Sequence, residues 1–465
     1  SCAILRLENK RNILVMLGKI LNYFGYPTKI HSTKIKIEPF SIKELGINKK
    51  HFSSAAIETT KKLQKNGFNA FIVGGAVRDL ILGLKPKDFD VVTNAKPEQI
   101  KKIFRRSRII GRRFKLVHVY IKDETIEVST FRSKSSTNVT FDSQGRITRD
   151  NSFGEQDDDA NRRDLSINSL YLDPLNDKVF DYHNGVSDIN HRIIKMIGIA
   201  SERYREDPVR MIRVLRFSAK LNFAIENKTY NDIKKHSNLI SGVPKSRLVD
   251  EIIKLLLSGN AMKGIRELWE TKLYVEAMPL LKDAFSNQTL KSSNLTVNEF
   301  LEVAFSLVDK RVSMQKPISL GFVFACLLWH RLLKAWSVNK SRGYREVPAL
   351  HDAINKIIED SFKSFPVQKR HLSDMKEIWI LQPRFEKRRG KAPYRLIKNL
   401  KFRVALNFLK LRAEIKMADS DLPSWWEEFS TQKEEERINL INSLSYPTPG
   451  LNPKKRNKSV GVHIT

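Results

Sequence analysis

The stretch Phe71-Ile-Val-Gly-Gly-Ala-Val-Arg-Asp79, which continues through Gly83 to Lys87-Asp88-Phe89-Asp90, decides how this chain folds. The apolar run Phe68–Val73 predicts a buried strand, and Val77–Leu82 predicts a helix. Two glycines between a strand and a helix let backbone N–H groups approach a ligand closely, and a helix N-terminus attracts an anion. A Gly-Gly pair alone is equally typical of a tight turn, so its meaning depends on the residues that follow.

Asp88 and Asp90 are the second feature of this stretch. Residues Phe89–Val92 predict a strand, on which side chains at i and i+2 share one face, so both aspartates point together while Phe89 packs behind. Adjacent carboxylates repel unless cations lie between them, and Mg²⁺ binds carboxylates together with phosphate oxygens. The triplet alone could be an exposed acidic turn. Together with the glycines, in a strongly basic chain, it predicts metal-assisted nucleotidyl transfer.

The net charge of the chain indicates what kind of partner it binds. Lys and Arg total 83 against 51 Asp and Glu among 465 residues, a formal net charge of +32. Such an excess repels itself in the free protein and is relieved by phosphate groups, so a polyanion is the expected partner. The alternatives are a merely solvated basic surface and an acidic membrane surface. No apolar run is long enough to span a bilayer, so no membrane insertion is expected.

Cysteine usage and the N-terminal residues bear on localisation. Only Cys2 and Cys326 occur, far apart, which excludes a disulfide framework or a cysteine zinc site and fits a reducing compartment. Residues Ile13–Leu17 resemble the start of a signal peptide, but Lys19 interrupts the apolar region and no cleavage site follows. We therefore expect a cytoplasmic protein.

The pattern along the chain predicts an α+β protein. A helix begins at Ser53, and Val117–Ile121 and Thr125–Phe131 alternate like paired strands, whereas helical spacing takes over after Tyr204, as in Glu206–Leu221. We therefore expect a small mixed sheet with helices, then an all-helical body and a disordered basic tail. The expected boundaries are 1–52 for a basic N-terminal extension, 53–200 for the head, 201–275 for a helical neck, 276–440 for the body and 441–465 for the tail.

A third carboxylate should complete a site built on two aspartates, and two candidates are available. Glu127 lies on the predicted strand Thr125–Phe131, on the same face as Ser129. The other candidate is Asp164, in the segment Arg162-Arg163-Asp164. Because three aspartates shortly precede that segment, an ordinary surface charge network is a further possibility.

The segment Arg205-Glu-Asp-Pro-Val-Arg-Met-Ile-Arg213 predicts the start of a helix. Pro208 suits the first helical position after an Asp207 cap, so helix capping alone would explain both residues. Arg210 and Arg213 recur at three-residue spacing, and with Arg216 they predict one cationic stripe. Asp207 would then either bond the edge of a base or hold Arg210 in place to do so.

The motifs Gly74-Gly75…Arg78-Asp79, Asp88-x-Asp90, Arg162-Arg163-Asp164 and Glu206-Asp207-x-x-Arg210 occur in the order seen in class II nucleotidyltransferases. The resemblance runs from about Ser41 to Phe429. That superfamily contains bacterial poly(A) polymerases and the enzymes that add CCA to tRNA. The resemblance implies that the two aspartates bind two Mg²⁺ ions, that the Arg-Arg-Asp segment contacts the incoming nucleotide, and that the neck helix reads its base.

Site residues are assigned on the strength of this resemblance and of the arguments above. The expected catalytic residues are Asp88, Asp90 and Asp164, with Asp88 and Asp90 as metal ligands. The expected nucleotide-binding residues are Gly74, Gly75, Arg78, Asp79, Glu127, Arg163, Asp207, Arg210 and Arg213.

Several segments resemble the poly(A) polymerase branch, which adds AMP from ATP to single-stranded RNA 3′ ends. They are Ile110–Val119, Ile378–Gln382 with the basic run Lys387–Lys391, Phe402–Glu414, Trp425-Trp426 and the basic tail. Aromatic residues among basic ones either stack bases or fill helix cores, and for Trp379 we expect the core. The expected RNA-binding residues are Arg112, Arg113, Lys387, Arg388, Arg389, Lys391, Lys454, Lys455 and Arg456.

Alternative functions come from three different classes. A CCA-adding enzyme shares the motifs, and an RNA-binding protein with an inactive head would share the charge but has no use for a repulsive carboxylate pair. A metal-dependent phosphohydrolase is suggested by His351-Asp352, with His330 as a further ligand. We expect a monomer, and the resemblance implies contact with RNA-decay machinery or an RNA chaperone. Residues 1–35 receive no role.

Overall fold

The computed structural model describes residues 37–111, 115–133, 139–141, 147–150, 153–285, 290 and 295–444. These residues form two compact units. Among the described residues, the first unit draws on 37–109, 117–130 and 170–182, and the second on the described parts of 110–116, 131–169 and 183–444. The predicted tail beyond residue 444 and the predicted N-terminal extension up to residue 36 lie outside the described residues.

A mixed eight-stranded sheet organises the first unit, as the sequence predicts for the head. β2 is buried at every position because it lies inside the sheet, antiparallel to β3 and to β9. β3 pairs in parallel with β6. In spatial order the strands are β1 (Phe40–Ser41), β10 (Lys178–Asp181), β9 (Leu170–Asp173), β2 (Ala70–Val73), β3 (Asp90–Thr93), β6 (Glu124–Thr130), β5 (Leu116–Ile121) and β4 (Ser107–Ile110).

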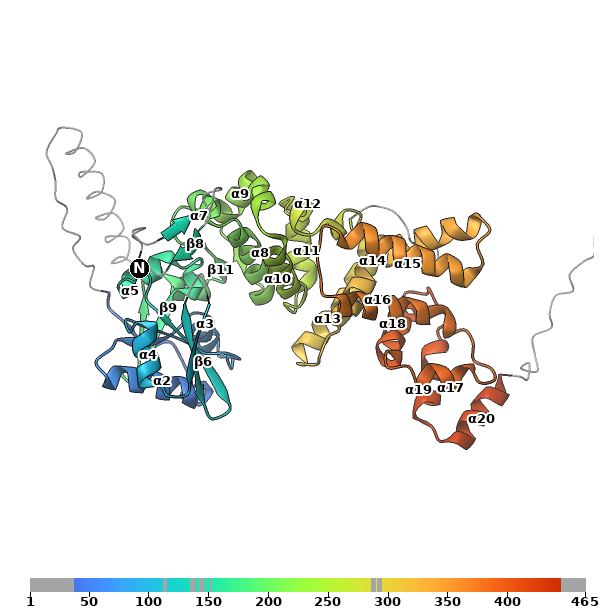
Figure 1. The fold of residues 1–465 in the computed structure, drawn as a ribbon, viewed down its shortest axis with the longest axis horizontal. Helices are drawn as coiled ribbons and strands as arrows, with labels where there is room; N and C mark the ends of the chain where they lie inside the picture. Colours follow the sequence, from blue (N-terminus) through green and yellow to red (C-terminus); the bar gives the residue numbers. More distant parts are fainter. Residues whose placement is uncertain are drawn as a thin grey trace, which may run out of the picture. The chain divides into compact units, whose positions relative to one another are not determined.

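Three helices pack on this sheet (Figure 1). α2 (Ser54–Lys65) begins where the sequence predicts, because the Ser53 side chain accepts from the Ala56 N–H at 3.0 Å. It packs against β2, β3 and β6 and beside α4 (Pro97–Ile103). α3 (Gly75–Ile81) follows β2 directly and packs against β2 and β9. A short 3₁₀ helix, η1 (Lys49–His51), precedes α2.

The predicted helix Glu206–Leu221 begins three residues later, as α8 (Val209–Leu221), and Glu206 is the last residue of the preceding helix, α7 (Ala200–Glu206). They are separated at Asp207-Pro208, since proline disfavours helical backbone in the residue before it. The other elements of this part of the second unit are short. They are β7 (Val139–Phe141), β8 (Ile147–Asp150), α5 (Gln156–Arg162), η2 (Ser166–Asn168), α6 (Gly185–Asn190), and the parallel pair β11 (Ile193–Ile194) and β12 (Ala224–Ile225).

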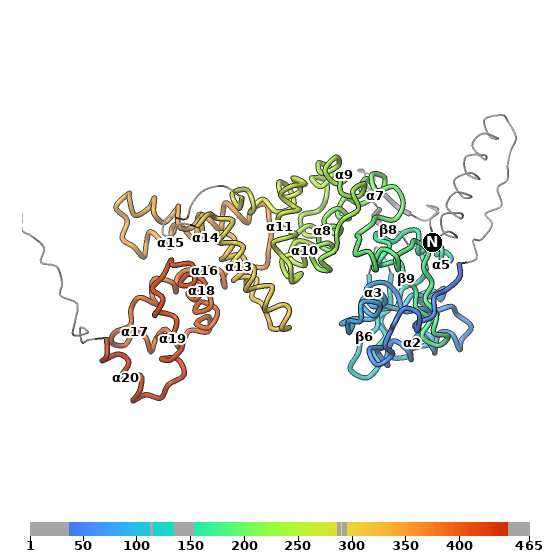
Figure 2. The backbone as a smooth tube through the Cα atoms, turned by 180° about the vertical axis from the view of Figure 1, so that it is seen from behind, coloured from blue at the N-terminus to red at the C-terminus, as the bar shows by residue number. Residues whose placement is uncertain are grey.

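Helices make up the rest of the described chain, which confirms the predicted all-helical body (Figure 2). α14 packs against α15 and α16, and α16 packs against α18. The α-helices are α9 (Asn227–His236), α10 (Lys245–Leu256), α11 (Ala261–Glu270), α12 (Tyr274–Ala277), α13 (Val297–Ser313), α14 (Leu320–Ser341), α15 (Glu346–Phe362), α16 (Lys369–Leu381), α17 (Ala392–Ile397), α18 (Phe402–Glu414), α19 (Leu422–Thr431) and α20 (Glu434–Ser443). The 3₁₀ helices are η3 (Ser237–Gly242), η4 (Pro279–Leu281) and η5 (Gln382–Arg384).

Two further observations concern the predicted boundaries and membrane insertion. α20 continues to Ser443, three residues past the predicted end of the body at residue 440. In the part of the chain that the structure describes, no helix combines the length and the apolar character needed to cross a membrane.

Candidate active site

The Gly74-Gly75 turn joins the sheet to α3. Gly74 has φ 75° and ψ −130°, a conformation that glycine adopts far more readily than other residues. Gly75 is constrained differently, because a Cβ atom there would lie 3.3 Å from Nη2 of Arg78. Arg78 is 2% exposed, and its Nε and Nη2 donate to Oδ1 of Asp79 at 2.8 and 2.6 Å. The Arg78 side chain therefore packs against the turn and is held by Asp79, and the role of Gly74 and Gly75 in nucleotide binding stays a prediction.

Asp88 and Asp90 flank a buried phenylalanine at the start of β3. Phe89 is 7% exposed, whereas both aspartates are exposed. β3 begins at Asp90, one residue later than predicted, but the alternation of exposed and buried side chains extends back to Asp88. Both carboxylates are therefore accessible to solvent while Phe89 anchors the segment in the core.

The strand register places Asp90 between two other residues of the predicted site. Asp90 pairs with Val73, the last residue before the glycine turn, and with Glu127 on β6. Side chains of directly paired residues lie on the same face of a sheet, so Glu127 is a neighbour of Asp90. Glu127 also lies 3.3 Å from His118, between Oε1 and Nε2. The turn, Asp90 and Glu127 thus meet at one end of β3.

These carboxylates fit a magnesium ion because Mg²⁺ prefers hard oxygen ligands. Among the residues that the structure describes, however, no three His, Cys, Asp or Glu side chains converge closely enough to hold a metal by themselves. Mg²⁺ commonly binds through one or two protein carboxylates and completes its octahedron with substrate phosphates and water. Asp88 and Asp90 match that mode of binding better than a closed protein cage.

Asp164 lies in the second unit, between α5 and η2, and forms an ion pair with Arg213 of α8. Its Oδ2 accepts from Nε of Arg213 at 2.6 Å, and its Oδ1 accepts from the Leu165 N–H at 2.9 Å. Burial raises the pKa of Asp164, but the charge and hydrogen bond of Arg213 outweigh burial and hold that pKa below its usual value. The charge of Asp164 in turn raises the pKa of Arg213. Since both its oxygen atoms are engaged, Asp164 is less available than Glu127 to bind a metal.

Arg163 is held by the acidic run that precedes it. Its Nε and Nη2 donate to Oδ2 of Asp159 at 3.2 and 3.0 Å, and Asp159 is 7% exposed. The backbone carbonyls of Arg162 and Arg163 accept from Nη2 of Arg203 at 2.6 and 2.8 Å. Burial and the nearby charge of Arg210 lower the pKa of Arg203 to about 10, so it stays charged at neutral pH. The Arg-Arg-Asp segment is therefore fixed by specific, partly buried contacts, among them ion pairs with Asp159 and Arg213 that fit the alternative of a structural charge network. Its role in nucleotide binding stays a prediction.

The three arginines predicted to form a cationic stripe on α8 are each paired with a carboxylate. Arg210 donates from Nη1 to Oε2 of Glu206 at 2.6 Å. Arg216 lies 2.8 Å from Glu251 on α10, and Arg213 lies 3.8 Å from the same residue in addition to its pair with Asp164. All three arginines lie on α8, and their charges are compensated by Asp164 and by carboxylates from α7 and α10.

Asp207 binds Arg247 of α10 instead of Arg210. Nη1 and Nη2 of Arg247 donate to Oδ1 and Oδ2 of Asp207 at 3.1 and 2.8 Å, a bidentate geometry. The side chains of Asp207 and Arg247 are 27% and 39% exposed, so the pair remains accessible to a ligand. Of the two predicted roles of Asp207, holding Arg210 in place is wrong, and bonding the edge of a base stays a prediction.

Arg203, Arg247 and Glu251 were not predicted from the sequence. Arg247 and Glu251 are four residues apart on a predicted amphipathic helix, a spacing typical of a solvated helix face. Nothing in that spacing connects them to Asp207 or to the arginines of α8. Only the packing of α10 against α8 reveals the link.

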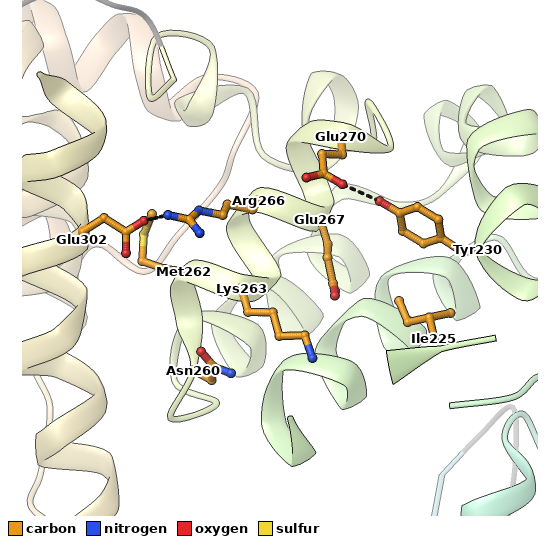
Figure 3. Close-up of a pocket in the computed structure, with 9 residues that line it drawn as sticks. All are labelled: Ile225, Tyr230, Asn260, Met262, Lys263, Arg266, Glu267, Glu270 and Glu302. Atoms are coloured by element: carbon orange, nitrogen blue, oxygen red, sulfur yellow. Dashed lines mark hydrogen bonds and ion pairs between the residues drawn. The ribbon is translucent and has the colours of Figure 1, made fainter. Parts of the chain in front are cut away.

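A pocket of about 500 Å³ lies on the neck (Figure 3). Most of its charged side chains already bond to other groups of the protein. Arg266 pairs with Glu302, and the Tyr230 hydroxyl donates to Glu270 at 2.8 Å. Burial raises the pKa of Glu267 to about 7. None of the predicted site residues lines this pocket, whose walls are Ile225, Tyr230, Asn260, Met262, Lys263, Arg266, Glu267, Glu270 and Glu302.

The basic loop Lys387–Lys391 lies between η5 and α17. Lys387, Arg389 and Lys391 are exposed, whereas the Arg388 guanidinium lies 5.7 Å from the ring centroid of Trp425. The loop therefore presents three cations to solvent, as its predicted role in RNA binding requires. The remaining predicted RNA-binding residues, Arg112, Arg113, Lys454, Lys455 and Arg456, lie outside the described residues.

The tryptophans near this loop fill the core of the body. Trp379 is fully buried, as predicted, and its Nε1 donates to the Ala325 carbonyl at 3.3 Å. Trp425 and Trp426 are 8% and 0% exposed, and they pack with Phe385. The alternative that Trp425 and Trp426 stack bases is therefore wrong.

The His351-Asp352 dipeptide of the phosphohydrolase alternative does not join a metal site. Oδ2 of Asp352 accepts from Nδ2 of Asn339 at 2.9 Å. His330 is 8% exposed, and burial lowers its pKa to about 4. The described residues supply no third ligand beside either histidine.

Three protein-family models and several known proteins match this chain. Residues 70–195 match the poly A polymerase head domain, residues 222–285 match the probable RNA and SrmB-binding site of polymerase A, and residues 342–460 match the polymerase A arginine-rich C-terminus. Poly(A) polymerase I of Salmonella typhi is 37% identical over 408 residues, which are 86% of this chain and 87% of that protein.

The sequence similarity to CCA-adding enzymes covers a smaller share of the chain. The CCA-adding enzyme of Ligilactobacillus salivarius is 34% identical over 266 residues, which are 56% of this chain and 64% of that enzyme. The crystal structure of the Bacillus stearothermophilus CCA-adding enzyme in complex with CTP superposes with a TM-score of 0.55 over 84% of this chain and 82% of that one. At 23% sequence identity, that superposition establishes the fold alone.

Proposed function

This chain belongs to the poly(A) polymerase family of nucleotidyltransferases, and we propose that it adds AMP from ATP to the 3′ ends of single-stranded RNA without a template. The resemblance to poly(A) polymerase I supports this choice over CCA addition, because it extends into the arginine-rich C-terminal region. The high positive charge supports a nucleic-acid substrate.

The observation that carries the proposal is the carboxylate arrangement at the start of β3. Two exposed aspartates flank a buried Phe89, and Asp90 lies in register between the glycine turn and Glu127. When bound there, Mg²⁺ would polarise the triphosphate and lower the pKa of the RNA 3′-hydroxyl. Asp88 and Asp90 would hold the ions, and Glu127 would accept hydrogen bonds or act as a further ligand from the neighbouring strand.

The Arg-Arg-Asp segment and the neck carry the groups assigned to nucleotide binding and selection. Arg163 is oriented by Asp159 and donates to the triphosphate, while Asp164 and Arg213 act as positioning residues that fix this segment to α8. Asp207 accepts from the exocyclic amine of adenine, and Arg210 or its neighbour Arg247 donates to ring nitrogens. No template is needed because these groups read the base directly.

Exposed cations hold the RNA by its phosphates. The loop Lys387–Lys391 is one such surface in the described part of the chain. The proposal places the protein in the cytoplasm, where ATP and RNA 3′ ends occur together. RNA-decay machinery or an RNA chaperone would be the protein partners that use such tails.

The test is to incubate the purified protein and Mg²⁺ with an unstructured RNA and each nucleoside triphosphate separately, and to size the products. We expect long tails with ATP and little extension with UTP or GTP. If the protein instead completes CCA on a trimmed tRNA, stops there and cannot extend the unstructured RNA with ATP, the chain is a CCA-adding enzyme.

A further inference from the structure

A second pocket, of about 370 Å³, opens in the body between α14, η5 and α18. Its walls include Trp329 and Trp336 from α14 and Arg412 from α18. Pockets of about 300–1,000 Å³ are typical of sites that receive groups the size of a small molecule. No residue of this pocket belongs to the site described above, and none was predicted to bind a ligand.

Two residues that line this pocket each carry a buried N–H group that has no acceptor among the described residues. Trp329 is 2% exposed, and its Nε1 makes no hydrogen bond. Arg412 uses Nη1 and Nη2 on Oε1 of Gln382 and the carbonyl of Met417, at 3.2 and 3.0 Å, but its Nε is likewise unbonded. Buried donors are nearly always paired, so an acceptor from a ligand or from water is expected here.

The pocket offers an aromatic face beside these donors. Trp336 is half-buried, and its Nε1 donates to the Glu346 carbonyl at 3.1 Å, which fixes the orientation of the indole. Lys340 lies 4.7 Å from the Trp336 ring centroid, and the Arg412 guanidinium lies 5.5 Å from that of Trp329. Flat faces that are already oriented favour the stacking of another flat group.

Charge distinguishes a base from a phosphate as the occupant. The lining contains Lys340 and Arg412 but also Glu346 and Glu386, so its formal charges balance in a chain that carries +32 overall. A phosphate site would gather uncompensated cations. A nucleobase is neutral, has two faces for stacking, and carries carbonyl and ring-nitrogen acceptors at its edge.

We propose that this pocket binds one unpaired base of the RNA, at a fixed distance upstream of the 3′ end that is being extended. The base stacks on Trp336, and its edge accepts hydrogen bonds from Nε1 of Trp329 and Nε of Arg412. The inference rests on the proposed function, since it takes RNA as the substrate. It adds a contact to a base to the phosphate contacts proposed for the loop Lys387–Lys391.

The test is an abasic scan by equilibrium binding without ATP. A single-stranded RNA is labelled at its 5′ end, and one base at a time is removed from successive positions while the backbone is kept. With the wild-type protein, removal at one position should weaken binding about tenfold, the effect expected for losing one stacked base. A flat profile across all positions overturns the proposal.

Variants of Trp336 test whether the base at the sensitive RNA position is the one bound in this pocket. Trp336→Ala should bind the intact RNA about tenfold more weakly and should lose the position-specific penalty, whereas Trp336→Phe should retain most of both. The matched control is Val338→Ala, which changes an exposed residue of the same helix outside the pocket. The salt dependence should stay unchanged in Trp336→Ala, because no phosphate contact is lost. A position-specific penalty that survives in Trp336→Ala would place the base elsewhere and overturn the proposal.

A measurement on the wild-type protein covers the case in which the alanine variant does not fold. A 4-thiouridine at the sensitive position should photocrosslink to peptides that contain Trp336 or Arg412, and crosslinks confined to other peptides contradict the proposal. Failure of this inference differs from failure of the proposed function. If the protein extends RNA with ATP but gives a flat abasic profile, only the base-binding role of the pocket is refuted. If it extends no RNA, the proposed activity itself is refuted.

Discussion

Asp164 and Arg213, which are 49 residues apart in the sequence, form an ion pair in which Oδ2 and Nε are 2.6 Å apart. The pair joins the Arg-Arg-Asp segment to α8, the helix that carries Arg210 of the Glu-Asp-x-x-Arg motif. Two motifs that the sequence shows separately are thus connected by one partly buried contact, with side chains 11% and 35% exposed.

Removing the cation of this pair should destabilise the protein. Arg213→Met leaves the Asp164 carboxylate buried without its partner, a change that costs ~3–5 kcal/mol in fully buried pairs. Because Arg213 is 35% exposed, we expect a loss of about 2 kcal/mol in the free energy of unfolding. Chemical denaturation at pH 7 measures it, and Asp164→Asn combined with Arg213→Met should recover part of the loss. Additive losses in the double variant would contradict the pairing.

The same pair predicts a pH dependence of stability. The folded pKa of Asp164 lies below its unfolded value of about 3.9, so the pair contributes stability above that pH. The contribution is lost as the pH falls through the folded pKa. The free energy of unfolding of the wild type should therefore fall more steeply below about pH 4 than that of the double variant. If the free energy of unfolding fell equally steeply with pH in both proteins, the ion pair would not be the cause of the loss of stability in acid.

Glu127 and Asp164 should respond differently to magnesium. Glu127 pairs in register with Asp90, so Glu127→Gln should lower turnover and raise the Mg²⁺ concentration needed for half-maximal activity several-fold. Asp164→Asn should lower turnover without moving that midpoint, because Asp164 is occupied by Arg213. Magnesium titrations of single-turnover AMP addition distinguish the two. A shifted midpoint in Asp164→Asn alone would reverse the assignment.

Arg247 should influence which nucleotide is accepted. Its two hydrogen bonds orient the Asp207 carboxylate, and a buried polar group left without its partner costs about 1–3 kcal/mol. Arg247→Ala should therefore erode the preference for ATP over GTP and UTP by about tenfold in kcat/KM, with a smaller effect on RNA affinity. Lys245→Ala removes a cation from the same helix and serves as the control, since Lys245 pairs with Glu276. Equal loss with all nucleotides would mean that the Asp207–Arg247 pair has no part in base selection.

The basic loop should bind RNA through its charge. Replacing Lys387, Arg389 and Lys391 by alanine removes three exposed cations. If each contacts one phosphate of a single strand, the slope of log K against log salt should become shallower by about 2, at about 0.7 per contact. Binding measured from low to moderate salt gives that slope, and Arg388→Ala should change it less because Arg388 packs on Trp425. An unaltered slope in the triple variant would exclude the loop from the RNA-binding surface.

The parts of this molecule that could be predicted from the sequence are those set by local patterns. β2, the glycine turn and the alternation around Phe89 follow from residues that are adjacent in the chain, so their prediction holds to within one or two residues. The pairs Asp207–Arg247 and Asp164–Arg213 could not be predicted, because they join residues 40 and 49 apart through the packing of helices. The carboxylate partners of the arginines on α8 could not be predicted for the same reason, since those carboxylates come from other helices.

The most direct test of the account is the rate of AMP addition by variants of the two aspartates of the predicted metal site. Asp88→Asn and Asp90→Asn keep the size of each side chain but remove its charge, and the loss of a metal ligand should lower the single-turnover rate roughly a thousandfold or more. Asp123→Asn, in the exposed turn between β5 and β6, is the matched control and should remain near the wild type. If either variant retains more than about a tenth of the wild-type rate at saturating Mg²⁺, that aspartate does not carry the metal-assisted chemistry assigned to it.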